Sequence, residues 1–208
     1  MSYEFYADSH TYKANGIVLP SVTANLKALG LIWTSADDLP RERGKRVHLA
    51  TQYDDEGTLD RQSVAAEDLP YLAAWIKFKS DTGFVIEAIE ETVFDEVLGV
   101  GGTIDRRGFF PNHRKFPKIP AIVDIKAGQV QPYVRLQTVG YGHAWISQMW
   151  RSPSSRSKWF LRCAVGLRPN GKYFIRWFDL KDWHRDLNDW RAVVRAANWK
   201  RLNGLEAA

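Results

Sequence analysis

The sequence feature that most constrains the fold is the apolar stretch AIVDIKAG at residues 121–128. Its length and composition predict a short buried strand. On a strand, residues two positions apart point to the same side, so Asp124 and Lys126 project together while Val123 and Ile125 face the opposite layer. An acid and a lysine on one face of such a strand indicate either an ordinary ion pair on a half-exposed sheet or a functional site.

Segments of helical and strand character lie on both sides of this strand, which predicts an α/β fold with a central mixed β-sheet flanked by helices. The chain has no repeat, low-complexity tract or linker, so we expect residues 1–208 to form one domain. The expected helices cover residues 40–52, 67–83 and 133–150, and the expected strands cover residues 84–110 around a Gly-rich corner.

Each end of the chain adds an elaboration to this core. The Asn-Gly pair at 15–16 favours a tight hairpin turn, and a helix follows with Ser21 or Thr23 as its cap. A second Asn-Gly pair, at 170–171, predicts a hairpin near the C-terminus. The chain then enters an amphipathic helix whose apolar face consists of Trp183, Leu187, Trp190 and Val194.

Composition narrows the class of protein. A chain of 208 residues buries roughly 70% of its unfolded surface, and 45% hydrophobic with 25% charged residues is ordinary for a globular protein. No run approaches the ~18 apolar residues of a membrane span, and the chain does not open with a secretion signal, so we expect a cytoplasmic protein without a membrane partner. The single cysteine, Cys163, excludes an internal disulfide and is expected to be a core thiol.

The net charge points to a possible class of partner. A formal charge of +5 and a pI near 9.3 suggest a polyanion, although charge of this size bears on association and not on the fold. The positive residues are concentrated in RERGKR at 41–46, in RRGFFPNHRK at 106–115 and along the C-terminal helix. Solvated surface faces explain such runs as well as a nucleic-acid site does.

The acid-x-lysine triplet at 124–126 is not informative by itself. A chain of this composition should contain about 1.4 such triplets by chance, and it contains two. The other one begins at Asp179, which follows a predicted strand and precedes a helix, so a helix N-cap explains it.

Asp105 distinguishes the first triplet from the second. It lies 19 residues before Asp124, which is enough for a strand, a turn and a return strand that bring the two carboxylates together. Two carboxylates beside a lysine form a hard-cation site, because Mg²⁺ and Mn²⁺ prefer oxygen ligands and keep several waters. Lys126 could then orient one of these waters or help to deprotonate it.

Four short motifs, in this order, resemble the PD-(D/E)XK nuclease superfamily, specifically its RecB-like exonuclease branch. They are RGKRVH with Gly44 and His48, GGTID with Asp105, IVDIKAG with Asp124 and Lys126, and QTVGY with Gln137 and Tyr141. The N-terminal HTYKANGIVLPSVT also resembles the opening of phage-encoded members, so the resemblance covers about residues 10–145.

This resemblance implies a restriction-endonuclease-like core and a metal-dependent DNA exonuclease that hydrolyses phosphodiester bonds from the ends of linear DNA. The expected cofactor is Mg²⁺ or Mn²⁺. An iron–sulfur cluster is not expected, because the branch that carries one uses four cysteines. The implied setting is phage or bacterial DNA recombination or repair, in the bacterial cytoplasm if the protein is phage-encoded, with a possible recombination partner protein.

The resemblance also implies roles for individual residues. The implied metal ligands are His48, Glu91, Asp105, Asp124 and the carbonyl of Ile125. Asp105, Asp124 and Lys126 form the catalytic set, in which the lysine positions the attacking water. Gln137 and Tyr141, four residues apart on one helix face, would hold the lysine and the DNA backbone in place. The residues expected to contact phosphates without reading bases are Arg41, Arg43, Lys45, Arg46, Arg106 and Arg107.

The upstream glutamate has several candidates, and two residues depart from the family pattern. The family usually carries a glutamate on the strand before the Gly-rich corner, and Glu91 fits this spacing best, with Glu90 or Glu87 as alternates. Asp124 stands where many members have glutamate, which shortens the reach to a metal by one methylene. Ala127 stands where threonine or serine is common, which affects a minor contact.

Three other functions stay open. A structure-selective DNA endonuclease would recognise a flap or a junction by shape. A catalytically inactive DNA-binding recombination accessory protein would keep the fold without the reaction, although the acids and the lysine are all present here. A metallohydrolase with a different substrate is the third, and no His-x-His pair supports it.

Overall fold

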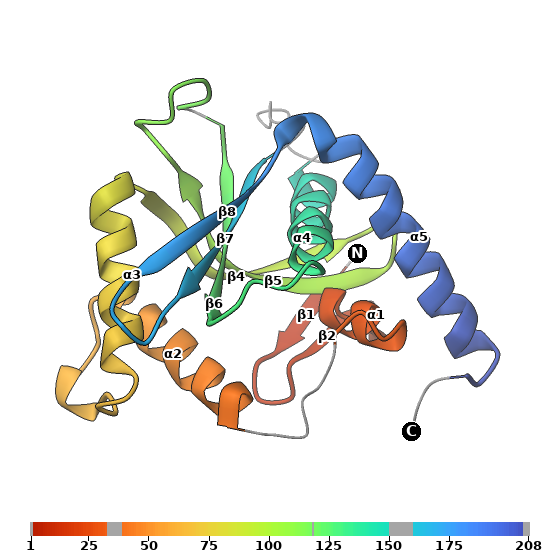
Figure 1. Ribbon diagram of the computed structural model, residues 1–208. Helices are drawn as coiled ribbons and strands as arrows, with labels where there is room; N and C mark the ends of the chain where they lie inside the picture. Colours follow the sequence, from red (N-terminus) through yellow and green to blue (C-terminus); the bar gives the residue numbers. More distant parts are fainter. Residues whose placement is uncertain (1, 33–38, 118, 150–159, 206–208) are drawn as a thin grey trace.

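The computed structural model describes residues 2–32, 39–117, 119–149 and 160–205, and a five-stranded mixed sheet runs through its centre (Figure 1). The strands, in their order across the sheet, are β4 (Val85–Asp95), β5 (Val100–Phe109), β6 (Ala121–Ala127), β7 (Leu161–Leu167) and β8 (Tyr173–Phe178). All neighbours are antiparallel except β6 and β7, which are parallel. The predicted α/β class with a central mixed sheet and flanking helices is confirmed.

The N-terminal elaboration is a small antiparallel sheet followed by a helix. Its strands are β1 (Tyr3–Tyr6), β2 (Thr11–Ala14) and β3 (Ile17–Leu19). The turn predicted at 15–16 joins β2 to β3, and both of its residues have positive φ, as a primed hairpin turn requires. Helix α1 (Val22–Ala28) begins after Ser21, whose Oγ accepts the N–H of Ala24 at 2.9 Å, so Ser21 is the cap.

Helices lie on both sides of the central sheet. On one side, α2 (Leu39–Glu56) and α3 (Leu69–Thr82) cover the sheet, and α3 ends at Gly83 with φ of 64°. On the other side, α4 (Val134–Met149) packs against the sheet and is backed by α5 (Trp183–Leu202) and α1 (Figure 1). Short 3₁₀ turns occur at Arg61–Ser63 and Leu180–Asp182. Within the described ranges, no helix has both the length and the apolar character needed to cross a membrane.

Two hydrophobic clusters, one on each side of the sheet, form the core. Val123 and Ile125 of β6 face the cluster under α3, whereas Ile122 faces the cluster under α4, as the alternation along a strand predicts. Cys163 of β7 is fully buried, as expected for a core thiol.

Helix α5 buries the face predicted for it. The four residues of its apolar face, Trp183, Leu187, Trp190 and Val194, are all buried in the cluster beneath α4. Glycines on α4 make this close approach possible: a Cβ at Gly140 would lie 3.0 Å from the ring of Trp190, and a Cβ at Gly142 would lie 2.7 Å from that of Trp183.

We expect Trp190→Ala to lower the free energy of unfolding by about 3–5 kcal/mol, because it leaves a large cavity between α4 and α5. Urea unfolding monitored by circular dichroism measures the loss. Trp199→Ala, on the same helix at a position that is 60% exposed, is the matched control and should cost much less. Equal losses in the two variants would contradict the packing described here.

Candidate active site

The candidate site lies where β5 and β6 separate. The two strands pair only along residues 106–108 and 121–123, so β5 offers no backbone partner to Ile125. The Oδ2 atom of Asp105 instead accepts the N–H of Ile125 at 2.7 Å, and the Ile125 carbonyl oxygen lies 2.8 Å from Nε2 of His48. Side chains of two predicted site residues thus satisfy backbone groups that the separation leaves without a strand partner.

Asp124 and Lys126 project from β6 together, as the alternation of a strand predicts. The Nζ atom of Lys126 lies 2.6 Å from Oδ2 of Asp124, and the Asp124 side chain is 1% exposed. Both oxygens of Asp124 are buried without a hydrogen bond of good geometry among the described residues, and Oδ1 lacks even the ion-pair contact that Oδ2 makes with Lys126. A buried acceptor without a partner indicates a place where a ligand can bind, because buried polar groups are nearly always paired.

Burial and the neighbouring charges together set the protonation of Asp124 and Lys126. Burial raises the pKa of Asp124 to about 7, against the opposing effect of Lys126 and with reinforcement from Asp105. Burial alone would lower the pKa of Lys126, but the charges of Asp124 and Asp105 outweigh it, so this pKa lies above its ordinary value. Lys126 therefore stays protonated at neutral pH and acts as a donor. It is not poised to deprotonate a water.

The acid on β4 that joins the site is Glu90. Ligand atoms of His48, Glu90 and Asp105 lie within 4.8 Å of one another and could hold a metal ion. Glu90 has φ of 47° and lies opposite Asp105 between regular pairs of the β4–β5 ladder. Burial, followed by the charge of Asp105, raises the pKa of Glu90 to about 7, and Arg106 opposes this rise.

Glu91, the acid that the sequence favoured, points elsewhere. Its Oε2 accepts from Nε of Arg107 at 2.6 Å, and its Oε1 accepts from Nε1 of Trp145 at 3.3 Å. The other alternate, Glu87, also accepts from Arg107, at 2.5 Å. Glu90 and Glu91 thus point to different partners, and the φ of 47° at Glu90 turns its side chain toward Asp105 and Arg106. Of the three candidate glutamates, only Glu90 lies beside His48 and Asp105.

Arg106 is the second correction, because it is unavailable to DNA. Its side chain is fully buried, with Nε donating to Asp55 at 2.6 Å and Nη1 donating to Glu90 at 2.9 Å. Asp55 is also fully buried and accepts the indole N–H of Trp75 at 3.0 Å. Arg106 therefore fixes Glu90 at the site from behind. No local pattern predicts this role, since Asp55 lies on α2, far from Arg106 in the chain.

The other basic residues expected at phosphates are mostly engaged with acids. Arg107 is 16% exposed and pairs with glutamates of β4, and Arg46 pairs with Asp68 at 2.6 Å. Lys45 lies 2.9 Å from Glu42, which Arg41 approaches to 3.6 Å. Arg43 stacks over the ring of Tyr71 with its guanidinium 5.4 Å from the ring centroid.

The two residues of the RGKRVH motif lie on one face of α2. His48 reaches the site, where loss of hydration, aided by Lys126 and Arg106, lowers its pKa. Asp105 and the Ile125 carbonyl oppose this effect. A Cβ at Gly44 would meet no described atom within 4 Å, so this glycine borders open space and not a strand.

Gln137 and Tyr141 meet on α4 as their spacing predicts. The Nε2 atom of Gln137 donates to the Tyr141 hydroxyl at 2.9 Å, and both side chains are buried. Burial, reinforced by the charges of Asp105 and Asp124, places the pKa of Tyr141 well above its ordinary value. The hydroxyl thus stays neutral beside the carboxylates. Gly102 makes room for the ring, since a Cβ there would lie 2.8 Å from it.

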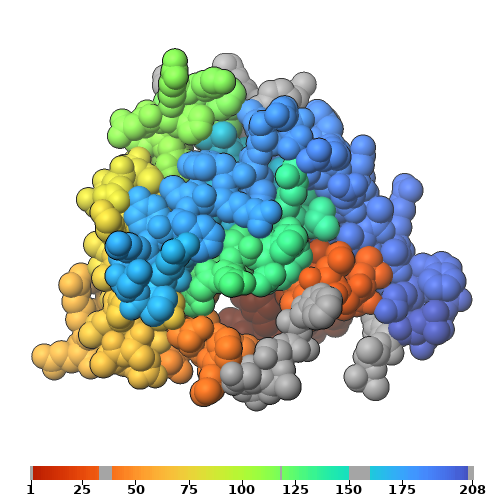
Figure 2. Space-filling view, in the orientation of Figure 1, coloured from red at the N-terminus to blue at the C-terminus, as the bar shows by residue number. Residues whose placement is uncertain are grey.

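Sequence reasoning did not single out Tyr133, the residue just before α4. Burial raises its pKa, the charge of Lys126 lowers it and the charge of Asp124 raises it further. Tyr133 also lines a cavity of about 650 Å³ together with Leu31, Gln131, Pro132 and Leu136. Figure 2 shows a recess between α2 and α1, beneath the green segment that leads into α4.

Comparisons with known proteins give little beyond the geometry. No family model and no curated protein matches the chain. Among solved structures, the alkaline exonuclease LHK-Exo in complex with dAMP is 14% identical, with 89% of this chain and 93% of that chain covered and a TM-score of 0.33. A second structure of LHK-Exo, from Laribacter hongkongensis, is 12% identical, with 86% and 91% covered and a TM-score of 0.32.

The raised pKa values of Asp124 and Glu90 predict how metal-free stability depends on pH. Each carboxyl titrates at its ordinary value of 3.8 or 4.5 when unfolded and at about 7 when folded. The folded state therefore holds protons that the unfolded state has lost. The contribution of these groups to stability is complete below pH 4 and is lost as the pH rises through 7.

Substitution of each carboxyl separates its effect on stability from that of His48. The lowered pKa of His48 makes stability rise with pH, whereas the raised pKa values of Asp124 and Glu90 make it fall. We expect Asp124→Asn and Glu90→Gln to gain stability relative to the unaltered protein as the pH rises from 4 to 8. Urea unfolding in EDTA at several pH values measures the difference. If the difference in the free energy of unfolding between variant and unaltered protein did not change with pH, the pKa values of these carboxyls would not be raised in the folded protein.

Proposed function

We propose that this protein is a metal-dependent nuclease whose active site is the cluster between β5 and β6. The observation that supports the proposal most directly is the convergence of buried Asp124, with its orphaned oxygen, on Asp105 and a protonated Lys126. Leaving a buried acceptor unpaired costs free energy, and structures keep such sites where a ligand completes them. Carboxylates beside a lysine suit hydrolysis by a metal-activated route.

The donor atoms that the fold brings within 4.8 Å of one another fit a hard divalent cation: they belong to Glu90, Asp105 and His48. Asp124, with its buried unpaired oxygens, is not part of that group, and we propose that it completes the ligand set together with the Ile125 carbonyl. Mg²⁺ and Mn²⁺ accept such a set, in which oxygen predominates. When bound, the ion would supply Lewis-acid stabilisation of a phosphodiester.

The protein side chains would perform the remaining tasks. Lys126, held at Asp124 and protonated, would donate to a water or to a phosphate oxygen. Arg106 would keep Glu90 turned toward the site. The neutral hydroxyl of Tyr141, held by Gln137, would pack against the carboxylates without adding charge.

DNA ends are the substrate that we propose, in recombination or repair. The proposed site would hold a phosphate through its metal and Lys126, and contacts to phosphate carry no sequence information. Such an enzyme has no means of choosing an internal sequence, and restriction to strand ends is the simplest way to limit cleavage. The proposal treats residues 1–208 as one nuclease domain.

We expect Asp105→Ala, Asp124→Ala and Lys126→Ala each to reduce Mg²⁺- or Mn²⁺-dependent hydrolysis of linear DNA by at least about 100-fold, because each removes a metal ligand or the positioned ammonium. The second acid-x-lysine triplet supplies the control. Asp179 accepts the N–H of Lys181 at 3.1 Å as the cap of a 3₁₀ turn, so Asp179→Ala should cost at most ~2 kcal/mol of stability and leave hydrolysis intact. Full activity in folded Lys126→Ala would reject the role of the lysine.

A nuclease that requires strand ends should not degrade circular DNA. Covalently closed circular duplex and single-stranded circles should survive conditions under which their linear forms are degraded, as gel electrophoresis would show. Rapid cleavage of both circles would favour a structure-selective endonuclease. Binding without cleavage of any DNA at any divalent ion would favour the inactive accessory protein.

A further inference from the structure

The sheet face that carries the proposed active site continues to the edge strand β8. The register pairs Lys126 of β6 with Gly166 of β7, and Gly166 with Phe174 of β8. Residues that pair across strands point to the same face, and Arg176, two positions after Phe174, shares it. Two strand spacings amount to about 10 Å, so Phe174 and Arg176 lie within reach of a ligand held at the site.

Gly166 makes room for the ring of Phe174. A Cβ at this position would lie 2.1 Å from the ring and 2.8 Å from the carbonyl oxygen of Gly128. Any other residue would push the ring off β7 or displace the loop that follows β6. The ring therefore lies across β7, on the side of β8 that faces the proposed active site.

Two arginines flank this ring without acidic partners. The guanidinium of Arg168 lies over Phe174, 5.0 Å from the ring centroid, and Nη1 of Arg176 donates weakly to the carbonyl of Val130 at 3.4 Å. Both arginines are exposed, and within the described parts of the chain neither has a carboxylate at ion-pair distance. Unlike Arg46 and Arg107, they are free to attract phosphates.

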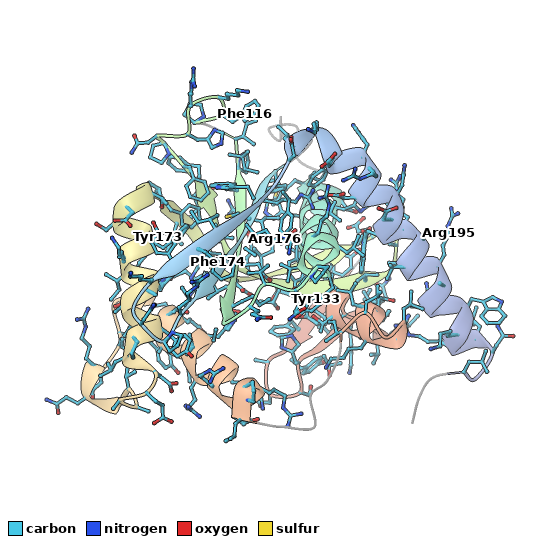
Figure 3. The ribbon with its side chains drawn as sticks, in the orientation of Figure 1. Phe116, Tyr133, Tyr173, Phe174, Arg176 and Arg195 are labelled. Carbon is cyan, nitrogen blue, oxygen red and sulfur yellow. The ribbon has the colours of Figure 1, made fainter. Side chains whose placement is uncertain are left out.

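The residues that cover the end of β8 do not extend over Phe174 and Arg176. Phe178, at the end of the strand, is buried beneath Val130, Tyr133 and Val134, whereas Arg176 is exposed and Phe174 is partly exposed. Figure 3 shows Phe174 and Arg176 along β8 at the front of the molecule, with Tyr133 near the start of α4. The group thus lies on an open surface that adjoins the proposed active site through the loop at 128–133.

We propose that Phe174, Arg168 and Arg176 form a binding site for unpaired DNA that is continuous with the active site. One base stacks on Phe174, and the two guanidinium groups contact neighbouring phosphates. A partly exposed aromatic ring beside arginines that have no acidic partners among the described residues is the chemistry that binds single strands without reading sequence. Phosphates follow at about 3.4 Å along a stacked strand, so about three nucleotides span the 10 Å from the site. This inference rests on the proposed nuclease function.

The test is the affinity of each variant for a fluorescein-labelled oligothymidine, measured by anisotropy in EDTA so that no cleavage occurs. Arg168→Gln and Arg176→Gln should each weaken binding and reduce the slope of log Kd against log salt concentration by about 0.7. Phe174→Leu, which keeps an apolar side chain but cannot stack, should weaken binding about 10-fold with the slope unchanged. The Phe174→Leu substitution should weaken binding of blunt duplex DNA less than binding of the single strand.

A matched control is Arg195→Gln, because Arg195 is an exposed arginine on α5, away from β8 (Figure 3). It should leave both the affinity and the salt slope unchanged. If the unaltered protein degrades linear DNA with Mg²⁺ but the three β8-side variants bind oligothymidine as tightly as it does, this inference is wrong and the nuclease function stands. If the unaltered protein neither degrades DNA nor binds oligothymidine, both proposals fail.

Discussion

The hydrogen bond from the N–H of Ile125 to Asp105 is the contact on which the candidate site depends. A strand that leaves its neighbour exposes backbone groups that must find other partners. Asp105 takes the place of a backbone carbonyl, and His48 lies at the Ile125 carbonyl in the same gap. The strands can therefore separate without orphaned backbone, and the gap admits the side chains of Glu90 and Asp124.

The buried charge of Arg106 determines which acids lie between the separated strands β5 and β6. Arg106 is fully buried, and a buried guanidinium is tolerated only when hydrogen-bonded carboxylates surround it. Asp55 supplies one carboxylate from α2, and Glu90 supplies the other from β4. The same contacts that solvate Arg106 thus hold Glu90 beside Asp105, so the architecture of the core and that of the site are one network.

Without a cation, this arrangement is electrostatically costly. Asp124 and Glu90 both have pKa values of about 7, because burial and repulsion from Asp105 disfavour their charged forms. Lys126 offsets only part of this repulsion, and it keeps its own proton. Perturbed carboxyl groups of this kind cluster at functional sites, where a ligand removes the cost. The free arginines at β8 extend the same surface with the opposite charge.

The sequence by itself determined whatever depends on a few neighbouring residues. Strand alternation placed Asp124 with Lys126, the Asn-Gly pair at 15–16 set a primed turn, and the helical period of α5 gave its buried face. Tertiary structure alone decided between Glu90 and Glu91, because the φ of 47° at Glu90 depends on its cross-strand position opposite Asp105 and on Arg106. It also decided which arginines are free, since pairing depends on acids that are distant in the chain and adjacent only after folding.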